Sequence, residues 1–334
     1  MPRPEALEYV LPLRWENDEG LDELTAYLRR LSEWVEVTVV DGSPAPRFEE
    51  HRRAWPFVRH VPPAVPGANG KARGAMTGIG ISRHERIVIA DDDVRYERAE
   101  LLRIGELLHV TDFVRPQNVF HPLPWHARWD TGRSLVNRAL GGDFSGTVGV
   151  RRSALRAGAY DTDVLFENLE LERAVRAHGG RVVVARELCV TRRPPSVARF
   201  FEQRVRQAYD DFAQPARLLR ELFILPLVLA AVTRRRWAAL AAGVIGVVAL
   251  AETGRRRAGG TDAFPATSAL WAPLWLAERA VTVWVALALR LRGGVRYRDS
   301  RISRAATPLR ELKRRAAASD LPNASKEHHH DRAA

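Results

Sequence analysis

The stretch Arg86-Ile87-Val88-Ile89-Ala90-Asp91-Asp92-Asp93 decides the predicted fold. Its first five residues form an apolar, β-branched run, typical of a buried strand, and three adjacent carboxylates follow directly. Similar short runs alternate along the chain with patterns of helical period. Strands are expected at 9–13, 35–40, 86–90, 110–114 and 181–185, and helices at 21–31, after Glu97 and at 169–178. The alternation predicts an α/β fold with a mostly parallel sheet flanked by helices.

Acidic residues stand where two of these strands end. Asp41 follows the strand at 35–40, and the triplet Asp91–Asp93 follows the strand at 86–90. Ligands of such sheets bind beyond the carboxyl ends of the strands. Mg²⁺ or Mn²⁺ relieves the repulsion between adjacent carboxylates and also binds substrate phosphates.

Alternation along an extended chain would let Asp91 and Asp93 share one metal ion, with Asp92 facing another ligand. The competing interpretation is a solvated loop whose acids cap the helix expected after Glu97.

Composition and charge exclude several classes of protein. A chain of 334 residues with 46% hydrophobic residues is neither disordered nor fibrous. The net charge of +12 arises after Pro215, whereas residues 1–215 are balanced. Nucleic-acid-binding domains usually carry a basic patch on the folded body, so nucleic acid is not an expected partner. One cysteine and an N-terminus without an apolar leader indicate a body in the cytoplasm.

Other phosphate-binding and catalytic motifs are missing from the sequence. The segment 67–72 lacks the spacing of a P-loop, and Gly78-Ile79-Gly80 lacks the third glycine of a dinucleotide-binding turn. The chain also has no Gly-x-Ser-x-Gly turn. These absences favour metal-assisted chemistry on a phosphorylated substrate.

The character of the chain changes after Pro215. Uncharged or nearly uncharged apolar runs occupy 222–233, 237–251 and 269–289, with arginines and tryptophans at their borders. Such borders are typical of a membrane interface, although a spanning helix needs about 20 apolar residues. We therefore expect a membrane-associated helical region, with a hairpin over 222–251. The alternative is a soluble helical domain with a thick core.

The predicted organisation has three parts. A catalytic domain occupies residues 1–215, a hydrophobic and basic helical region occupies 216–315, and a disordered tail occupies 316–334. An even number of membrane crossings would keep the basic tail on the cytoplasmic side.

Six motifs follow one another along residues 8–215. They are Pro12–Glu16, Val37–Ser43, Asn69–Gly74, Ile89–Asp93, Glu167–Leu171 and Gln203–Gln207. Their order and spacing resemble the family 2 glycosyltransferases, inverting enzymes with the GT-A fold that use nucleotide-diphosphate sugars. The last motif, placed just before apolar helices, is similar to the lipid-linked and processive members.

The resemblance implies a function and a site. A sugar would pass from a UDP-sugar to a hydroxyl of a lipid or glycan acceptor of the cell envelope, with inversion, at the cytoplasmic face of the cell membrane. Asp91 and Asp93 would hold Mg²⁺ or Mn²⁺, and Asp41 would bind the uracil ring. The implied donor-binding residues are Pro12, Glu16, Asp41, Lys71, Asp91, Asp92, Gln203 and Arg206.

Two positions depart from the family pattern. Asn168 stands where the family has its catalytic aspartate, and an amide cannot accept a proton at neutral pH. Glu167 then becomes the expected base, with Glu170 one turn further on as the alternative; Glu167 could also serve only as a helix cap. Gln207 replaces a tryptophan of the acceptor channel, and an ordinary charged helix face would also explain Gln203 and Arg206.

Two other functions compete with sugar transfer. The first is a catalytically inactive membrane-attached scaffold, which Asn168 motivates. The second is a sugar nucleotidyltransferase. That class has a glycine-rich loop after its first strand, and the segment 12–17 contains no glycine.

Overall fold

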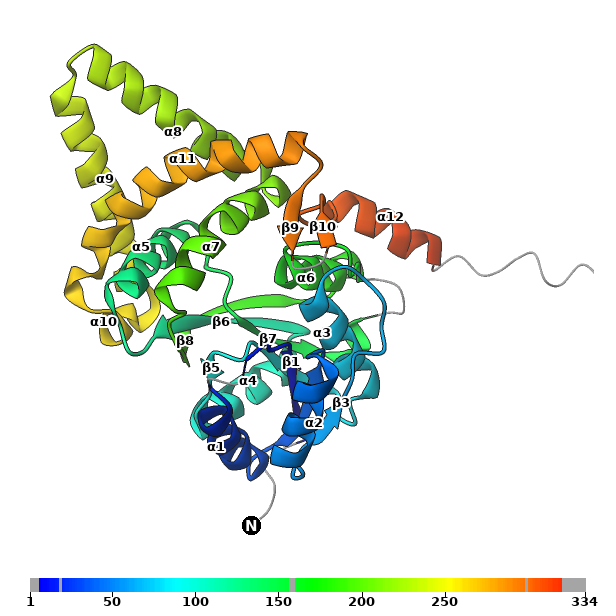
Figure 1. Cartoon of the computed structure of the whole chain (residues 1–334). Helices are drawn as coiled ribbons and strands as arrows, with labels where there is room; N and C mark the ends of the chain where they lie inside the picture. The colour runs from blue at the N-terminus through cyan, green and yellow to red at the C-terminus, as the bar shows by residue number, and fades with distance from the viewer. Residues whose placement is uncertain (1–5, 18–19, 156–159, 298–299, 320–334) are drawn as a thin grey trace, which may run out of the picture.

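The computed structural model describes residues 6–17, 20–155, 160–297 and 300–319. An eight-stranded sheet, in the order β3-β2-β1-β4-β7-β6-β8-β5, forms its centre (Figure 1). β5 and β7 run antiparallel to their neighbours, and the other pairs are parallel. The strands are β1 Leu7–Leu13, β2 Glu36–Asp41, β3 Arg59–Val61, β4 Arg86–Ala90, β5 Val94–Arg95, β6 Phe113–Phe120, β7 Thr147–Arg151 and β8 Val182–Arg192. The predicted α/β class is confirmed.

Helices cover both faces of the sheet. Alternate side chains of each strand point to opposite faces, so apolar residues on both faces need helices to pack against. Tyr9 and Leu11 of β1 join a core cluster with Leu28 of α1, whereas Val10 joins another cluster with Ile79 of α3. The helices up to residue 209 are α1 Leu21–Ser32, α2 Ala45–Ala54, α3 Gly70–Ile81, α4 Arg98–Val110, α5 Trp125–Leu140, α6 Glu167–Ala177 and α7 Val197–Tyr209.

One predicted strand is misplaced. The run at 110–114 was expected to be a strand, but α4 continues to Val110 and β6 begins at Phe113. Leu101, Ile104 and Leu108 bury one face of α4 at helical spacing, and this stripe outweighs the β-propensity of the valine that follows. β8 is also longer than the predicted 181–185, because it pairs with β6 as far as Arg192.

Five helices of the described chain follow residue 214. They are α8 Pro215–Thr233, α9 Trp237–Arg256, α10 Gly260–Ala263, α11 Ala272–Leu291 and α12 Leu309–Ser319. A two-stranded sheet (β9 Val295–Tyr297, β10 Ser300–Ile302) lies between α11 and α12 in the chain. Short 3₁₀ turns lie at Arg152–Ala154, Asp210–Ala213, Arg257–Gly259 and Ala266–Trp271. α12 corrects the predicted start of the tail at 316, since the helix continues to Ser319; residues 320–334 lie outside the described part.

α8 and α9 form a hairpin whose tip projects from the body (Figure 1). Apolar side chains at this tip are exposed: Phe223, Leu227, Leu229, Val232, Trp237, Val244 and Ile245. By length and composition, two segments of the described chain could cross a membrane, Trp237–Ala263 and Ala266–Leu291. α8 is not one of them, because its first turns carry Arg217, Arg220 and Glu221.

Buried polar contacts tie these helices to the body. Arg279 of α11 is 1% exposed and donates from Nη1 to Asp211 Oδ2 at 2.7 Å. Arg138 of α5 is fully buried and donates to the carbonyl of Gly254 at 3.0 Å and to that of Arg257 at 2.5 Å. Since an unpaired buried charge is costly, these contacts fix how α9 and α11 sit on the sheet domain.

The contact between α3 and β1 generates one prediction. A Cβ added at Gly78 would lie 2.2 Å from Cγ1 of Val10, whereas a Cβ at Gly80 of the same helix would meet no atom within 4 Å. Gly78→Ala should therefore lower the free energy of unfolding by about 1–3 kcal/mol through overpacking. Gly80→Ala, the matched control, should raise it by about 0.5–1 kcal/mol because alanine favours the helix. Urea unfolding of both variants checks this, and equal effects would contradict it.

Candidate active site

A polar cavity of about 280 Å³ lies at the ends of the strands. Its walls include Pro12 at the end of β1, the triplet after β4, and Arg192 at the end of β8. The structure thus brings into one cavity most residues that the sequence singled out: Pro12, Lys71, Asp91, Asp92, Asp93, Glu167, Gln203 and Arg206. Glu16 and Asp41 are not among its lining residues.

Lys71 joins two of the predicted acids. Its Nζ lies 2.5 Å from Asp91 Oδ1 and 2.7 Å from Glu167 Oε1. Asn69 places it at the start of α3, because the Asn69 side chain accepts hydrogen bonds from the backbone N–H groups of Lys71 and Ala72. Burial lowers the pKa of Lys71, but the two carboxylates outweigh burial and hold this pKa above its usual value. Lys71 is thus a permanent cation.

Arg192 neutralises the other side of the triplet. Its Nε donates to both oxygens of Asp93 at 3.0 Å, and its Nη2 lies 3.5 Å from Asp91 Oδ2. Burial, opposed by Arg192 and reinforced by Asp91 and Asp92, raises the pKa of Asp93 to about 6. Arg192 therefore contacts both acids predicted to hold a metal ion.

Asp92 faces another partner. Its Oδ2 accepts a hydrogen bond from Nε1 of Trp15 at 2.5 Å. The backbone at Gly146 passes close to the triplet: its carbonyl accepts from the Asp91 N–H at 2.8 Å, and an added Cβ would lie 2.7 Å from Asp91 Oδ2. A side chain at position 146 would therefore require the Asp91 carboxylate to shift from its observed position.

The structure distinguishes the two candidate bases. Glu167 lies in the cavity, whereas Glu170 is fully buried, accepts from the backbone N–H of Thr307 at 2.6 Å and does not line the cavity. Asn168 lines the cavity but donates from Nδ2 to the carbonyl of Ser145 at 2.9 Å. Of the two candidate bases, Glu167 is the one whose side chain lines the cavity.

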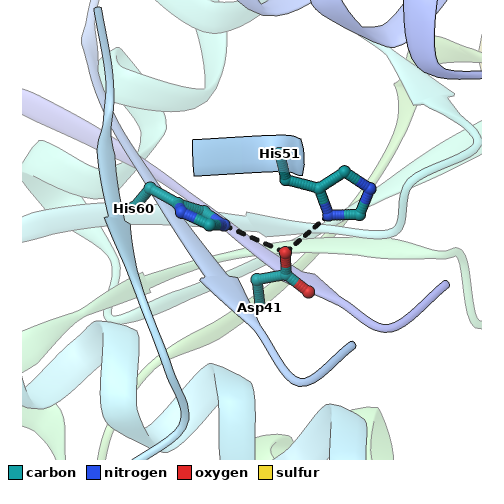
Figure 2. Close-up of side chains that lie close together, drawn as sticks. All are labelled: Asp41, His51 and His60. Carbon is teal, nitrogen blue, oxygen red and sulfur yellow. Dashed lines mark hydrogen bonds and ion pairs between the residues drawn. The ribbon is translucent and has the colours of Figure 1, made fainter. Parts of the chain in front are cut away.

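Asp41 lies at the end of its strand as predicted, but its side chain is buried rather than open to a ligand. Its side chain is fully buried, and Figure 2 shows His51 and His60 directed at its carboxylate. Oδ2 accepts from His51 Nδ1 at 2.6 Å and from His60 Nε2 at 2.9 Å, and Oδ1 accepts from the Ser43 N–H at 2.9 Å. Burial acts to raise the pKa of Asp41, but these hydrogen bonds hold it well below its usual range. Contact with a uracil ring would require them to open.

Among the residues that the structure describes, two groups of side chains are candidates to hold a metal ion. Asp91 and Asp93 offer only oxygen atoms, the ligands that Mg²⁺ and Mn²⁺ prefer. Asp41, His51 and His60 offer one oxygen and two nitrogens within 4.8 Å of one another, a set suited to Zn²⁺. The hydrogen bonds within the second group already satisfy its carboxylate. The first group lines the cavity, and the second does not.

Glu16 also lies outside the cavity. Its side chain is 62% exposed and forms an ion pair with Arg14, whose Nε lies 3.2 Å from Glu16 Oε1. Gln203 and Arg206 line the cavity from α7, and Arg206 stacks over the ring of Tyr297.

Sequence analysis missed three residues of the site. Trp15 lies inside a quoted motif but received no role, and Arg192 lies beyond the predicted end of its strand. Asp210, at the end of α7, lines the cavity but carries no motif. For Arg192, the apolar run 188–190 indicates that the strand continues past residue 185, but no local pattern shows that the end of this strand reaches the cavity.

Comparisons with known proteins establish the fold. No protein-family model matches the sequence, and no curated protein matches it. The mannosyltransferase from Pyrobaculum calidifontis, solved in complex with GDP-Man and Mn²⁺, is similar over 84% of this chain and 87% of that chain, with a TM-score of 0.53 and 20% identity. Glucosyl-3-phosphoglycerate synthase from Mycobacterium tuberculosis, solved with phosphoglyceric acid, matches 59% of this chain and 75% of that chain, with a TM-score of 0.41 and 16% identity. The first likeness confirms the predicted GT-A-type fold.

The buried Asp41 cluster generates a prediction about stability. Asp41→Asn replaces one carboxylate oxygen with an NH2 group, so either the Ser43 N–H or the two imidazole N–H groups lose their acceptor. An unsatisfied buried donor costs about 1–3 kcal/mol. Asp22→Asn, on the exposed face of α1, should change the free energy of unfolding by less than about 0.5 kcal/mol. Urea unfolding measures both. Unchanged stability of Asp41→Asn, together with weaker nucleotide binding, would return Asp41 to the base-binding role.

Proposed function

We propose that this chain is a glycosyltransferase that moves a sugar from a nucleotide-diphosphate donor to an acceptor hydroxyl with inversion. One observation carries the proposal: the cavity at the strand ends brings the acids Asp91, Asp93 and Glu167 together with the cation Lys71. A GT-A-type fold shared with a mannosyltransferase solved with GDP-Man and Mn²⁺ supports it.

Asp91 and Asp93 are proposed to hold Mg²⁺ or Mn²⁺. Both residues fit this role, since they present carboxylate oxygens to one cavity and are both contacted by the same guanidinium group. The bound ion would offset charge on the diphosphate as the nucleotide leaves. Lys71 and Arg192 are the cationic side chains that contact these two acids, and both could also bind phosphate oxygens of the donor.

Further donor contacts are proposed for other residues of the cavity wall. Pro12 and Asp92 line the cavity at the ends of β1 and β4, and Gln203 and Arg206 line it from α7. UDP is the proposed nucleotide, with GDP as the alternative because the mannosyltransferase was solved with GDP-Man. The buried Asp41 and the exposed Glu16 supply no observation in favour of a direct contact.

Glu167 is proposed as the general base. Its carboxylate reaches the cavity, whereas the neighbouring Asn168 uses its amide for a backbone hydrogen bond and has no basic atom. Glu167 would remove the proton of the acceptor hydroxyl as this hydroxyl attacks the anomeric carbon. The attack comes on the face opposite the leaving nucleotide, and it therefore inverts that carbon. The ion pair with Lys71 at 2.7 Å orients this carboxylate.

The acceptor is proposed to be a lipid or an envelope glycan, met at a membrane. Two helical segments are long and apolar enough to span a bilayer, and the α8–α9 tip exposes large apolar side chains. Arginines near the tip and at the end of α11 fit the anionic headgroups of a cytoplasmic leaflet. The sheet domain would then stay on the cytoplasmic side.

Metal-dependent donor binding gives the first test of this function. UDP or GDP should bind the wild-type protein with Mn²⁺, and EDTA should weaken binding at least 10-fold. Asp91→Asn and Asp93→Asn should each lose the Mn²⁺-dependent part of the nucleotide affinity, because each removes a charged ligand of the metal ion. Isothermal titration calorimetry measures the affinities, with Asp22→Asn as a charge-matched control. Wild-type affinity that ignores EDTA would contradict the metal role.

The base has its own test. Glu167→Gln should lower the rate of nucleotide release from a UDP- or GDP-sugar by about 10²–10⁴-fold while donor affinity stays within about 3-fold. Glu170→Gln, buried away from the cavity, should keep a rate close to that of the wild type in the fraction that folds. Undiminished turnover of Glu167→Gln would move the role to another group, and inactivity of the wild type with every donor would favour the scaffold.

Membrane association is tested on the hairpin tip. Vesicles of phosphatidylcholine and phosphatidylglycerol should carry the wild-type protein in a flotation gradient. Leu227→Glu combined with Ile245→Glu should reduce the floating fraction several-fold, because two charges then enter the apolar tip. Val110→Glu, equally exposed but at the end of α4, is the control. Flotation unaffected by the tip variants would place the contact elsewhere.

A further inference from the structure

Asp210 is a cavity residue for which the proposed reaction has no role. It is the first residue after α7 and lines the cavity together with Glu167 and Arg206. Its Oδ1 atom is buried and has no hydrogen-bond partner. A buried carboxylate oxygen without a partner is costly when the group is charged and much less so when it is protonated.

The surroundings of Asp210 oppose its negative charge. The carboxylates of Glu167 from α6 and of the adjacent Asp211 repel it, and so does the negative end of the α7 dipole. Arg206 of α7 and Arg279 of α11 attract it, yet neither lies within ion-pair distance, and Arg279 is paired with Asp211 instead. Burial, more than these charges, raises the pKa of Asp210 well above its usual range.

The position of Asp210 points to the acceptor end of the cavity. Arg217 of α8 and Arg279 of α11 also line the cavity, and both contact Asp211, the residue next to Asp210, at 2.9 and 2.7 Å. An acceptor that comes from the membrane side would pass these helices before it reaches Glu167. Asp91 and Asp93, the proposed metal ligands, contact cations of other elements: Lys71 of α3 and Arg192 of β8.

We infer that Asp210 is a specificity-determining residue of the acceptor site, an un-ionised carboxyl group that donates a hydrogen bond to a second hydroxyl of a sugar-bearing acceptor. This inference rests on the proposed function. It does not need Asp210 to move a proton in the reaction, because Glu167 takes the proton of the attacking hydroxyl. Asp210 thus selects for acceptors that carry a hydroxyl beside the reacting one.

The protonation state can be measured without any substrate. An infrared difference spectrum of wild type minus Asp210→Asn at pH 7 should show the carbonyl stretch of an un-ionised carboxyl group. The corresponding difference for Asp22→Asn, an exposed aspartate, should show only a carboxylate. A carboxylate band for Asp210 at pH 7 would overturn the inference.

The acceptor role is measured with n-octyl glycosides as probe acceptors and GDP-mannose or UDP-glucose as donors. Asp210→Ala should raise the acceptor KM by about 10-fold, the loss expected for one buried hydrogen bond, with the donor KM unchanged. Asp210→Asn keeps a neutral N–H donor and should stay within about 3-fold of the wild type. The acceptor KM of the wild type should rise at alkaline pH, where Asp210 loses its proton, and that of Asp210→Asn should not.

Two failures are separable. If the wild type turns over no donor, the proposed function fails, and the acceptor role falls with it. If the wild type is active but Asp210→Asn is as impaired as Asp210→Ala, or if all three proteins share one acceptor KM, only the role of Asp210 is wrong.

Discussion

Charge balance at the acidic triplet is the constraint on which the site depends. Three adjacent carboxylates at the end of a buried strand would repel one another, and the chain supplies two cations against them, Lys71 from α3 and Arg192 from β8. Lys71 comes from a helix and Arg192 from the end of a strand, so the site forms only when α3 and β8 are both in place. In the proposed function a divalent ion would bind the carboxylates and a diphosphate would bind the two cations, so both ligands would replace ion pairs that the site already contains.

The sequence predicted the local parts of this site and missed the long-range ones. The strand at 86–90 was found at its observed bounds because its apolar run and the acids after it are contiguous. Arg192 was missed because Arg186 and Glu187 interrupt the apolar pattern of β8, and only pairing with β6 carries that strand to the cavity. No local pattern shows which residues will be brought to a strand end by another strand.

Asp41 illustrates the opposite case, a correct position with a different environment. The motif places it at the end of β2, as predicted, and the structure agrees. Yet its carboxylate is taken by His51 and His60, which lie 10 and 19 residues further along the chain. Their approach depends on how α2 folds back onto β3, with Phe48 and Trp55 stacked on the two rings. A motif fixes residue identity, whereas the packing around it decides what the residue can touch.

The buried contacts of Arg138 and Arg279 bear on how this protein can be handled. A fragment that stops at residue 215 would keep Asp211 and Arg138 but lose Arg279 and the carbonyls of Gly254 and Arg257. Asp211 and Arg138 would then lose these partners, and a buried charge without its partners is costly. A fragment shortened at residue 215 is therefore expected to fold poorly, and the chain with its C-terminal helices is the better starting material for recombinant work.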